Sequence, residues 1–436
     1  MRTLNKLTFL SCLAAVLLLV GCNKHEEEET VHYGRTVMVY MAMQNSLGSY
    51  GFHRNDSTEI ANAMAYIPEN DRLLLFIDDS DVPRLYELSK GLSAPKLVWK
   101  SKTEASSAAA GMVKQMLQFM QTNYPSDDYG LVMGSHATGW IPTPDNTAAS
   151  SNSRKTFGLD TGEGTMSKDK GPNGTEPDQI EIDDLAAAIT QSGVHLRYLL
   201  FDACLMQCIE VDYALRKVTD FVIAPPISIA AEGAYYTDLV RYGLFSASAE
   251  DVAKTYASYY QGTGSIPYYS EDDLWNFYGT VISCVRTAGL EKLAADVKVA
   301  LQHVATAETL PIVWPLEKQN VLHYQAYLSR FYYRPHAYDM LSSLKAMGIA
   351  EEDLAVLCSD LETVITNKEA TAQFSMGGLY NSFVSIPADD QWCGVSMFVP
   401  QKVYTSNAVN CAYGDLNEKF RSTQWYKAAG WEATGW

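Results

Sequence analysis

A histidine and a cysteine that each follow an apolar run are the residues best suited to chemistry in this chain. The first run ends in Met133-Gly-Ser-His136, and the second ends in Leu200-Phe-Asp-Ala-Cys204. Short continuous apolar runs are typical of strands buried on both faces. Functional side chains collect past the carboxyl ends of such strands in a parallel sheet. A thiol beside an imidazole is the minimal equipment for acyl transfer, so we predict that these two side chains meet.

The elements that must position this pair alternate between strands and helices along the first half of the chain, which predicts a mostly parallel sheet with crossover helices. A hairpin is predicted from Arg84–Ser89 and Lys96–Ser101. The other strands are predicted at Thr36–Ala42, Arg72–Asp78, Gly130–Ser135, Tyr198–Ala203 and Phe221–Pro225, and helices at Thr58–Tyr66, Ser106–Tyr124, Ile182–Ser192 and Leu205–Lys217.

The chain of 436 residues is long for one ordinary core. We expect residues 35–240 to form the catalytic core and residues 241–436 to form a mixed α/β extension. In the extension, helices are predicted at Ala249–Tyr260, Leu290–Thr306, Tyr338–Met347 and Leu354–Thr366, and strands at Tyr278–Val285, Gly378–Ile386 and Gly394–Val399.

The N-terminus is typical of an exported protein. Residues 1–21 carry a positive start followed by an apolar run that is short for a membrane span, which is the pattern of a signal peptide. The sequence Leu19-Val-Gly-Cys22 resembles a bacterial lipobox, which implies lipidation of Cys22. Residues 22–34 are polar and acidic, and they resemble an export signal that directs lipoproteins to the outer face of the outer membrane. The alternative for this segment is a solvated tether.

Charge and cysteine content exclude some classes of partner and site. The formal net charge of −18 argues against nucleic acid as a partner. The chain has eight cysteines without paired Cys-x-x-Cys spacing, so a zinc site is not expected and no metal ligands are assigned. Cys208 lies in helical register with apolar neighbours, and we interpret it as a core residue. Disulfides among Cys284, Cys358, Cys393 and Cys411 stay open.

Several segments together resemble the clostripain family of cysteine peptidases, part of the larger group that holds caspases, legumain and gingipains. The resemblance spans about residues 35–430 and implies a caspase-like sheet fold with a C-terminal extension. It rests on Thr36-Val-Met-Val-Tyr-Met-Ala42, Met133-Gly-Ser-His136-Ala-Thr-Gly-Trp140, Ile180-Glu-Ile-Asp-Asp-Leu185, Leu200-Phe-Asp-Ala-Cys204-Leu-Met and Gly394-Val-Ser-Met-Phe-Val-Pro400.

The resemblance implies a role for each matching residue. The family's catalytic histidine falls on His136, its nucleophile on Cys204, and its specificity acid on Asp202. The backbone N–H groups of Cys204 and of the residue after the histidine form the oxyanion hole. The family usually has glycine after the histidine, whereas this chain has Ala137. A methyl group there disfavours positive φ, so the hole is distorted if the family's glycine needs such a backbone.

Two further expectations concern the pocket and the cysteine itself. Asp202 would attract a P1 Arg or Lys side chain, with Glu232 as a candidate second acid. The alternative for Asp202 is a carboxylate that is hydrogen-bonded to a neighbouring loop. Cys204 is predicted to open the helix Leu205–Lys217, where the helix N-terminus favours a thiolate. Its alternative is a buried structural thiol.

The predicted function is that of a lipid-anchored cysteine endopeptidase that cleaves peptides or proteins after Arg or Lys. The alternative is a catalytically weak or inactive lipoprotein of the same fold that binds peptides or glycans. Two features support this alternative: alanine at position 137 in place of the family's glycine, and the many aromatic residues. Clostripain itself is associated with calcium, and the carboxylates of this chain do not decide whether it needs the ion.

Residues 141–179 form a long polar, glycine-rich loop between the histidine strand and the helix before the cysteine strand. Loops of this length within a domain are usually functional or disordered. This one carries Arg154 and Lys155, the residue types that the Asp202 pocket would accept, and the family is commonly matured by cleavage in the corresponding loop. The loop is predicted to be a processing segment, and the alternative is a passive surface insertion.

The lipobox yields the first testable prediction. Cys22→Ala removes the sulfur that would carry the lipid, so the variant is expected to stay in the periplasm as a soluble protein or to persist as a precursor. Detergent phase partitioning of the wild type and the variant measures this. If the two proteins partition alike, Cys22 is not the anchor.

Overall fold

The computed structural model describes residues 31–141, 157–161, 178–268, 279–329, 332–376, 383–405 and 415–436. The chain divides into Met1–His32 and a compact unit from Tyr33 to Trp436. The second unit holds every helix and strand of the described residues.

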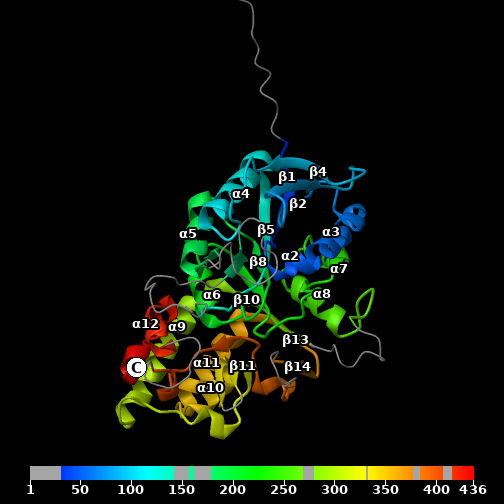
Figure 1. Cartoon of the computed structure of the whole chain (residues 1–436). Coiled ribbons are helices and arrows are strands. Elements are labelled where there is room, and N and C mark those ends of the chain that lie inside the picture. The colour runs from blue at the N-terminus through cyan, green and yellow to red at the C-terminus, as the bar shows by residue number, and fades with distance from the viewer. Residues whose placement is uncertain are drawn as a thin grey trace, which may run out of the picture. The chain divides into compact units, whose positions relative to one another are not determined.

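A nine-stranded sheet forms the centre of this unit (Figure 1). Its strands are β1 (Tyr33–Ala42), β2 (Arg72–Asp78), β3 (Arg84–Leu88), β4 (Lys96–Lys100), β5 (Ser126–Gly134), β8 (Tyr198–Asp202), β9 (Phe221–Ala224), β10 (Val281–Arg286) and β13 (Ile365–Ala370). The spatial order is β13-β10-β9-β8-β5-β1-β2-β3-β4. The five strands from β9 to β2 are parallel, and antiparallel strands extend the sheet at both edges.

Helices cover both faces of the sheet, which explains why its central strands are apolar throughout. Along β1, Met38 and Tyr40 face one core cluster, whereas Val37 and Val39 face the other. This alternation follows from the two-residue period of a strand. One face packs against α4 (Ala110–Asn123), α5 (Ile182–Ser192), α6 (Ile209–Leu215) and α9 (Leu290–Ala307), and the other against α3 (Phe52–Asn62), α7 (Tyr236–Asp238) and α8 (Glu250–Tyr260) (Figure 1).

The order of the parallel strands creates a reversal point between β1 and β5. From β1 the chain moves outward to β2, and the later strands β5, β8 and β9 follow on the other side of β1. Ligand sites of open α/β sheets lie beyond the carboxyl ends of the strands at such a point. A ligand site is therefore expected at the loops after β1 and β5.

The remaining elements surround this sheet. Because β10 and β13 come from the second half of the chain, the central sheet continues past residue 240. The other elements are β6 (Phe157–Asp160) paired with β7 (Asp178–Ile180), the sheet of β11 (His323–Ser329), β12 (Tyr332–Asp339) and β16 (Ser396–Met397), the pair β14 (Gln373–Ser375) and β15 (Phe383–Ser385), and the helices α2 (Ser46–Tyr50), α10 (Met340–Ala346), α11 (Glu351–Val364), α12 (Leu416–Arg421) and α13 (Gln424–Ala428).

The predicted α/β class with a mostly parallel, caspase-like sheet is confirmed. The predictions for Arg72–Asp78 and Ile182–Ser192 match β2 and α5 at both ends, and the predicted hairpin is the pair β3–β4. The bounds of these elements could therefore be predicted from their apolar patterns.

Other boundaries differ from prediction for local reasons. The predicted helix Tyr338–Met347 begins at Met340, because Asp339 ends β12 and its side chain caps α10 by accepting the Ser342 N–H at 2.9 Å. The strands β6, β7, β11, β12, β13 and β14 were not predicted. Within the strand predicted over Gly378–Ile386, residues Phe383–Ser385 form β15. Residues 377–382 lie outside the described residues.

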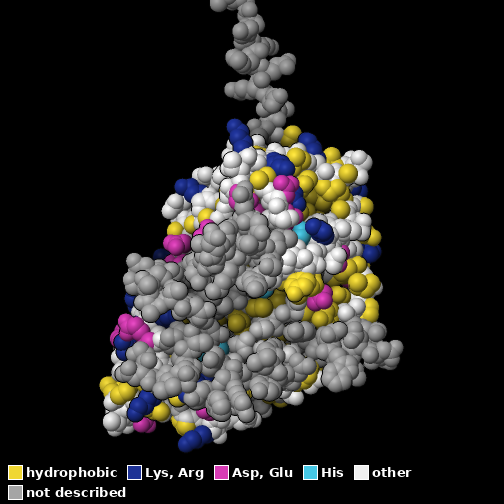
Figure 2. All heavy atoms as spheres, in the orientation of Figure 1, with side chains coloured by type: hydrophobic (Ala, Val, Ile, Leu, Met, Phe, Trp, Pro, Cys, Tyr) yellow, Lys and Arg dark blue, Asp and Glu magenta, His cyan; other side chains and the backbone are white. Residues whose placement is uncertain are grey.

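The surface agrees with an acidic chain. On the face drawn in Figure 2, described Lys and Arg side chains lie singly or in small groups, with Asp and Glu side chains scattered between them. Within the described ranges, no helix combines the length and the apolarity needed to cross a bilayer.

Candidate functional site

The register between β5 and β8 brings the predicted histidine and cysteine to one edge of the sheet. Gly134 at the end of β5 pairs with Asp202 at the end of β8. His136 and Cys204 each lie two residues beyond this pair, on parallel neighbouring strands. The two following loops also touch, since a Cβ added at Gly139 would lie 2.6 Å from the Leu205 carbonyl oxygen. Gly139 has a φ of 67°, so both its backbone and its contact require glycine.

The segment after Cys204 is a loop, so the prediction that Cys204 opens a helix is wrong. Helix α6 begins at Ile209. Leu205 has a left-handed φ of 63°, which a continuing α-helix cannot accommodate. Its N–H donates to the Ile227 carbonyl at 2.9 Å, which ties the loop to the chain beyond β9 instead. A helix dipole therefore does not act on Cys204, and any activation of the thiol must come from other groups.

The environment of the Cys204 sulfur favours the neutral thiol. Burial raises the pKa of Cys204 above its usual value, although the Ile229 N–H opposes this by donating to Sγ at 3.4 Å. The negative charge of Asp202 raises the pKa further. A thiol with a raised pKa needs a base that takes its proton during the reaction.

His136 is held by a residue that sequence reasoning missed. Its Nε2 lies 2.8 Å from Oγ of Ser46, the first residue of α2. Asn45 caps this helix by accepting the Leu47 N–H, and its amide group donates to the Ala42 and Leu159 carbonyls. The contact therefore joins the loop after β1 to the loop after β5, at the reversal point of the sheet. A sequence signal was present, because the polar pair Asn45-Ser46 begins three residues after the end of β1.

The backbone around Ala137 does not need glycine. Among the described residues, the non-glycine positions with positive φ are Leu205 and Asn320, so Ala137 is not in the left-handed region. Ala137 forms a bridge with Phe157, whose hydrogen bond runs from the Gly158 N–H to the His136 carbonyl at 3.0 Å. The bridge therefore does not use the Ala137 N–H, and the added methyl group causes no backbone strain.

Asp202 is buried and is hydrogen-bonded to a neighbouring loop, as its alternative interpretation expected. Its Oδ2 accepts from the Ala234 N–H at 3.1 Å and from the Tyr236 hydroxyl at 3.0 Å, and its Oδ1 accepts from the Tyr256 hydroxyl at 3.1 Å. Gly233, with φ of 60°, lies so close that a Cβ would meet Oδ2 at 2.5 Å. A carboxylate has about four acceptor sites, so Oδ1 keeps capacity for one more donor.

More acidic residues act on Asp202 than the sequence suggested. Burial, followed by the charges of Asp202, Glu59 and Glu232, raises the pKa of Asp56 well above its usual value. Burial raises the pKa of Glu59 to about 7, against the hydrogen bond from the Tyr236 N–H, and the charges of Asp202 and Asp238 add to the rise. Glu232 is exposed. This acidic group (Asp56, Glu59, Asp202 and Glu232) would be stabilised by a cation, because like charges repel one another.

The remaining candidate residues fall into two sets. Cys22, Arg154, Lys155 and Cys411 lie outside the described residues. Among the described cysteines, Cys204, Cys208, Cys284, Cys358 and Cys393 are free thiols. Cys208 is buried, as expected of a core residue.

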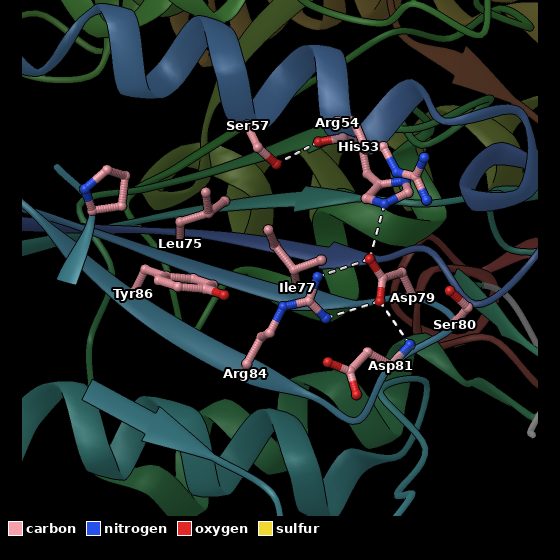
Figure 3. Close-up of a pocket in the computed structure, with 11 residues that line it drawn as sticks. His53, Arg54, Ser57, Leu75, Ile77, Asp79, Ser80, Asp81, Arg84 and Tyr86 are labelled. Atoms are coloured by element: carbon pink, nitrogen blue, oxygen red, sulfur yellow. Dashed lines mark hydrogen bonds and ion pairs between the residues drawn. The ribbon is translucent and has the colours of Figure 1, made fainter. Parts of the chain in front are cut away.

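A separate cavity of about 480 Å³ lies between α3 and the β2–β3 hairpin (Figure 3). Its polar groups partner one another: Arg84 makes two hydrogen bonds of 2.8 Å to Asp79, and Nε2 of His53 lies 2.9 Å from Oδ2 of the same carboxylate. Burial of Asp79 is outweighed by these partners, which hold its pKa well below the usual range. The cavity contains no nucleophile beside a base, so it does not compete with Cys204 as a candidate active site.

Comparison with known proteins agrees with this geometry. The sequence pattern of the clostripain family matches residues 39–436. A secreted cysteine protease from Bacteroides thetaiotaomicron, solved in complex with an irreversible peptide inhibitor, is similar with a TM-score of 0.71 and 23% identity, over 92% of this chain and 99% of that chain. An inactive zymogen protease from Parabacteroides distasonis is similar with a TM-score of 0.69 and 24% identity, over 91% and 98%. Among curated proteins, no sequence matches.

Proposed function

The chain belongs to the clostripain family of cysteine peptidases, and we propose that it is an endopeptidase that cleaves after Arg or Lys by means of Cys204 and His136. The observation that carries this proposal is the equal offset of the two residues beyond the paired Gly134 and Asp202. By this offset, the thiol and the imidazole each follow the end of one of two adjacent parallel strands, two residues after Asp202 and Gly134. Peptides or proteins are the corresponding substrates.

In the proposed mechanism, His136 takes the proton of the Cys204 thiol as the sulfur attacks the scissile carbonyl carbon. We assign this role to Nδ1, because Nε2 lies against Ser46. The N–H groups of Cys204 and Ala137 stabilise the oxyanion of the tetrahedral intermediate. His136 then gives the proton to the leaving amine, and water hydrolyses the thioester that remains on Cys204.

The acidic group explains the proposed preference for a basic P1 side chain. Asp202 keeps one acceptor site on Oδ1, and the charges of Asp202, Glu59 and Glu232 are close enough to raise the pKa of Asp56. A guanidinium or ammonium group would lower the repulsion among these carboxylates and so gain more than a neutral side chain. Glu232 is exposed and therefore suits the rim of this pocket rather than its base.

The alternative of an inactive binding protein had its main support in Ala137. The backbone there lies outside the left-handed region, so alanine fits without distorting the N–H group. This favours turnover over binding alone. For location, the similar protease from Bacteroides thetaiotaomicron is secreted, and we propose that this chain is exported likewise and then held at the outer membrane, at the cell surface, through a lipid on Cys22.

The second prediction concerns the catalytic pair. Cys204→Ala is expected to abolish peptide cleavage, and His136→Ala to lower kcat/KM by about 100-fold or more, because a general base contributes on that order. Ser46→Ala removes one hydrogen bond to the imidazole and is expected to cost about tenfold and to shift the pH profile. Ser49→Ala, on the exposed face of the same helix, is the matched control. Full activity of Cys204→Ala would overturn the assignment.

The third prediction concerns the P1 pocket. Asp202→Asn keeps the shape of the side chain and removes its charge, so cleavage after Arg is expected to fall by about tenfold or more relative to cleavage after citrulline. Citrulline is the control because it retains the shape of Arg without the charge. Glu232→Gln should show a smaller change in the same direction. An equal loss on both substrates would mean that Asp202 shapes the site instead of recognising charge.

The fourth prediction concerns the loop at residues 141–179. In the sequence, Lys155 comes two residues before β6, whose Gly158 N–H donates to the His136 carbonyl. We propose that the active enzyme cuts this loop after Arg154 or Lys155.

Incubation of the purified protein followed by N-terminal sequencing of the fragments tests this step. The cut is expected in the wild type and not in Cys204→Ala incubated alone. An Arg154→Ala, Lys155→Ala double variant controls for cleavage elsewhere. A wild-type chain that remains intact while fully active contradicts the proposal.

A further inference from the structure

A large aromatic side chain lies almost fully in solvent one helical turn from the residue that contacts His136. Tyr50, the last residue of α2, is 81% exposed, the highest value among the exposed large hydrophobic side chains of the described residues. The ring of Phe52, which is partly buried, lies 6.4 Å away between ring centroids. Single exposed apolar side chains are common on protein surfaces, so exposure alone assigns no role to Tyr50. Its position beside the candidate active site does.

The face of α2 that carries Tyr50 is the face that meets His136. Ser46 and Tyr50 are four residues apart, and residues with this spacing lie on one face of a helix. Oγ of Ser46 lies 2.8 Å from Nε2 of His136, and Figure 1 shows the helix beside the end of the sheet where β5 and β8 finish. Gly48 lies on the opposite face and is buried, because a Cβ there would meet the Met43 carbonyl oxygen at 1.8 Å. The helix therefore packs against the protein through Gly48 and leaves Ser46 and Tyr50 on the side of the candidate active site.

Hydrogen bonds hold this short helix in place at its start. The side chain of Asn45 accepts the Leu47 N–H at 2.9 Å and donates to the Leu159 carbonyl at 2.8 Å. At its end, Gly51 adopts a left-handed φ of 85°, and its N–H caps the last turn. A side chain on an element that is already ordered loses less conformational entropy when a ligand binds. The tyrosine is therefore presented on a preorganised support.

The order of the strands decides which part of a substrate Tyr50 would meet. β8, β5 and β1 are neighbours in that order, so His136 lies between Cys204, beyond β8, and α2, beyond β1. In the proposed mechanism the acyl part of the substrate stays on Cys204, and the leaving amine takes its proton from His136. The leaving part of the substrate thus lies on the histidine side of the nucleophile, which is the side of α2.

From this arrangement we infer that Tyr50 forms a subsite for the leaving part of the substrate and favours an apolar or aromatic side chain at P1′ or P2′. This subsite rests on the proposed function and adds recognition beyond the scissile bond. Four residues of helix separate Tyr50 from Ser46 by about 6 Å. An extended peptide advances about 3.5 Å per residue, so the ring is within reach of the first two residues after the scissile bond. A phenol ring offers them a flat apolar surface.

Cleavage of paired peptides tests the subsite. Two fluorogenic peptides carry the same Arg at P1 and differ at P1′ and P2′, where one has Leu-Leu and the other Ser-Ser. The wild type is expected to have the higher kcat/KM on the Leu-Leu peptide, and Tyr50→Ala is expected to lower this preference by about fivefold. Tyr50→Phe keeps the ring and should keep the preference. Tyr242→Ala removes a 50% exposed tyrosine in the segment after α7 and, as the matched control, should keep it too.

Partition of the acyl-enzyme measures the same subsite in a second way. An Arg ester loads its acyl group onto Cys204, and an added dipeptide amide then competes with water for the thioester. The amine nitrogen attacks the thioester carbon, the C–N bond forms as the C–S bond breaks, and the amine proton passes through His136 to the cysteine sulfur. Leu-Leu amide is expected to capture more of the acyl group than Ser-Ser amide, and Tyr50→Ala to lower this difference by about fivefold.

The results separate this subsite from the proposed function. If the wild type fails to cleave after Arg, or if Cys204→Ala cleaves, the proposed function is wrong and the subsite with it. If the wild type cleaves after Arg but shows no Leu-Leu preference, or if Tyr50→Ala keeps that preference in both measurements, the subsite is wrong and the proposed function stands. Because Tyr50 is so exposed, Tyr50→Ala should have the Tm of the wild type, and a lost preference at unchanged Tm supports the subsite.

Discussion

The parallel register between β5 and β8 is the constraint on which the candidate active site depends. Pairing of Gly134 with Asp202 fixes where each strand ends, and the two loops then begin side by side. A shift of one residue would turn the side chains of either strand to the opposite face and separate the histidine from the cysteine. The apolar residues that pack against helices on both faces hold that register. Packing in the core therefore fixes where the loops with His136 and Cys204 begin.

A second theme is the concentration of buried and half-buried acids at this edge of the sheet. Asp202, Asp56 and Glu59 gather on one side, and Asp78, Asp160 and Glu104 gather near the ends of β1 and β2. Buried carboxyls are unfavourable unless they bind protons, hydrogen-bond donors or cations. Tyrosine hydroxyls and a backbone N–H satisfy most of Asp202, whereas Asp78 retains an unpaired oxygen. The two groups therefore differ in how far the protein itself satisfies their carboxyl oxygens.

Strand β6 connects these features although it is only four residues long. It contributes Asp160 to the second of these groups, a backbone bond to the loop of His136, and an acceptor for Asn45. It also lies within the long segment that carries Arg154 and Lys155. A displacement of β6 would therefore reach the histidine loop through a backbone hydrogen bond.

Periodicity and residue type determined the class of fold, the buried strands β1, β2, β5, β8 and β9, and Cys204 and His136 as candidates, whereas Asp202 became a candidate specificity acid through the family resemblance. These depend on local patterns, because a strand buried on both faces must be apolar and a loop at its carboxyl end can carry polar chemistry. The tertiary structure decided the rest. It showed that Cys204 lies in a loop with Leu205 at positive φ, that Ser46 contacts His136, and that Ala137 needs no glycine. It also assembled Asp78, Glu104 and Asp160, which are distant in the chain, so that no spacing in the sequence could reveal their contact.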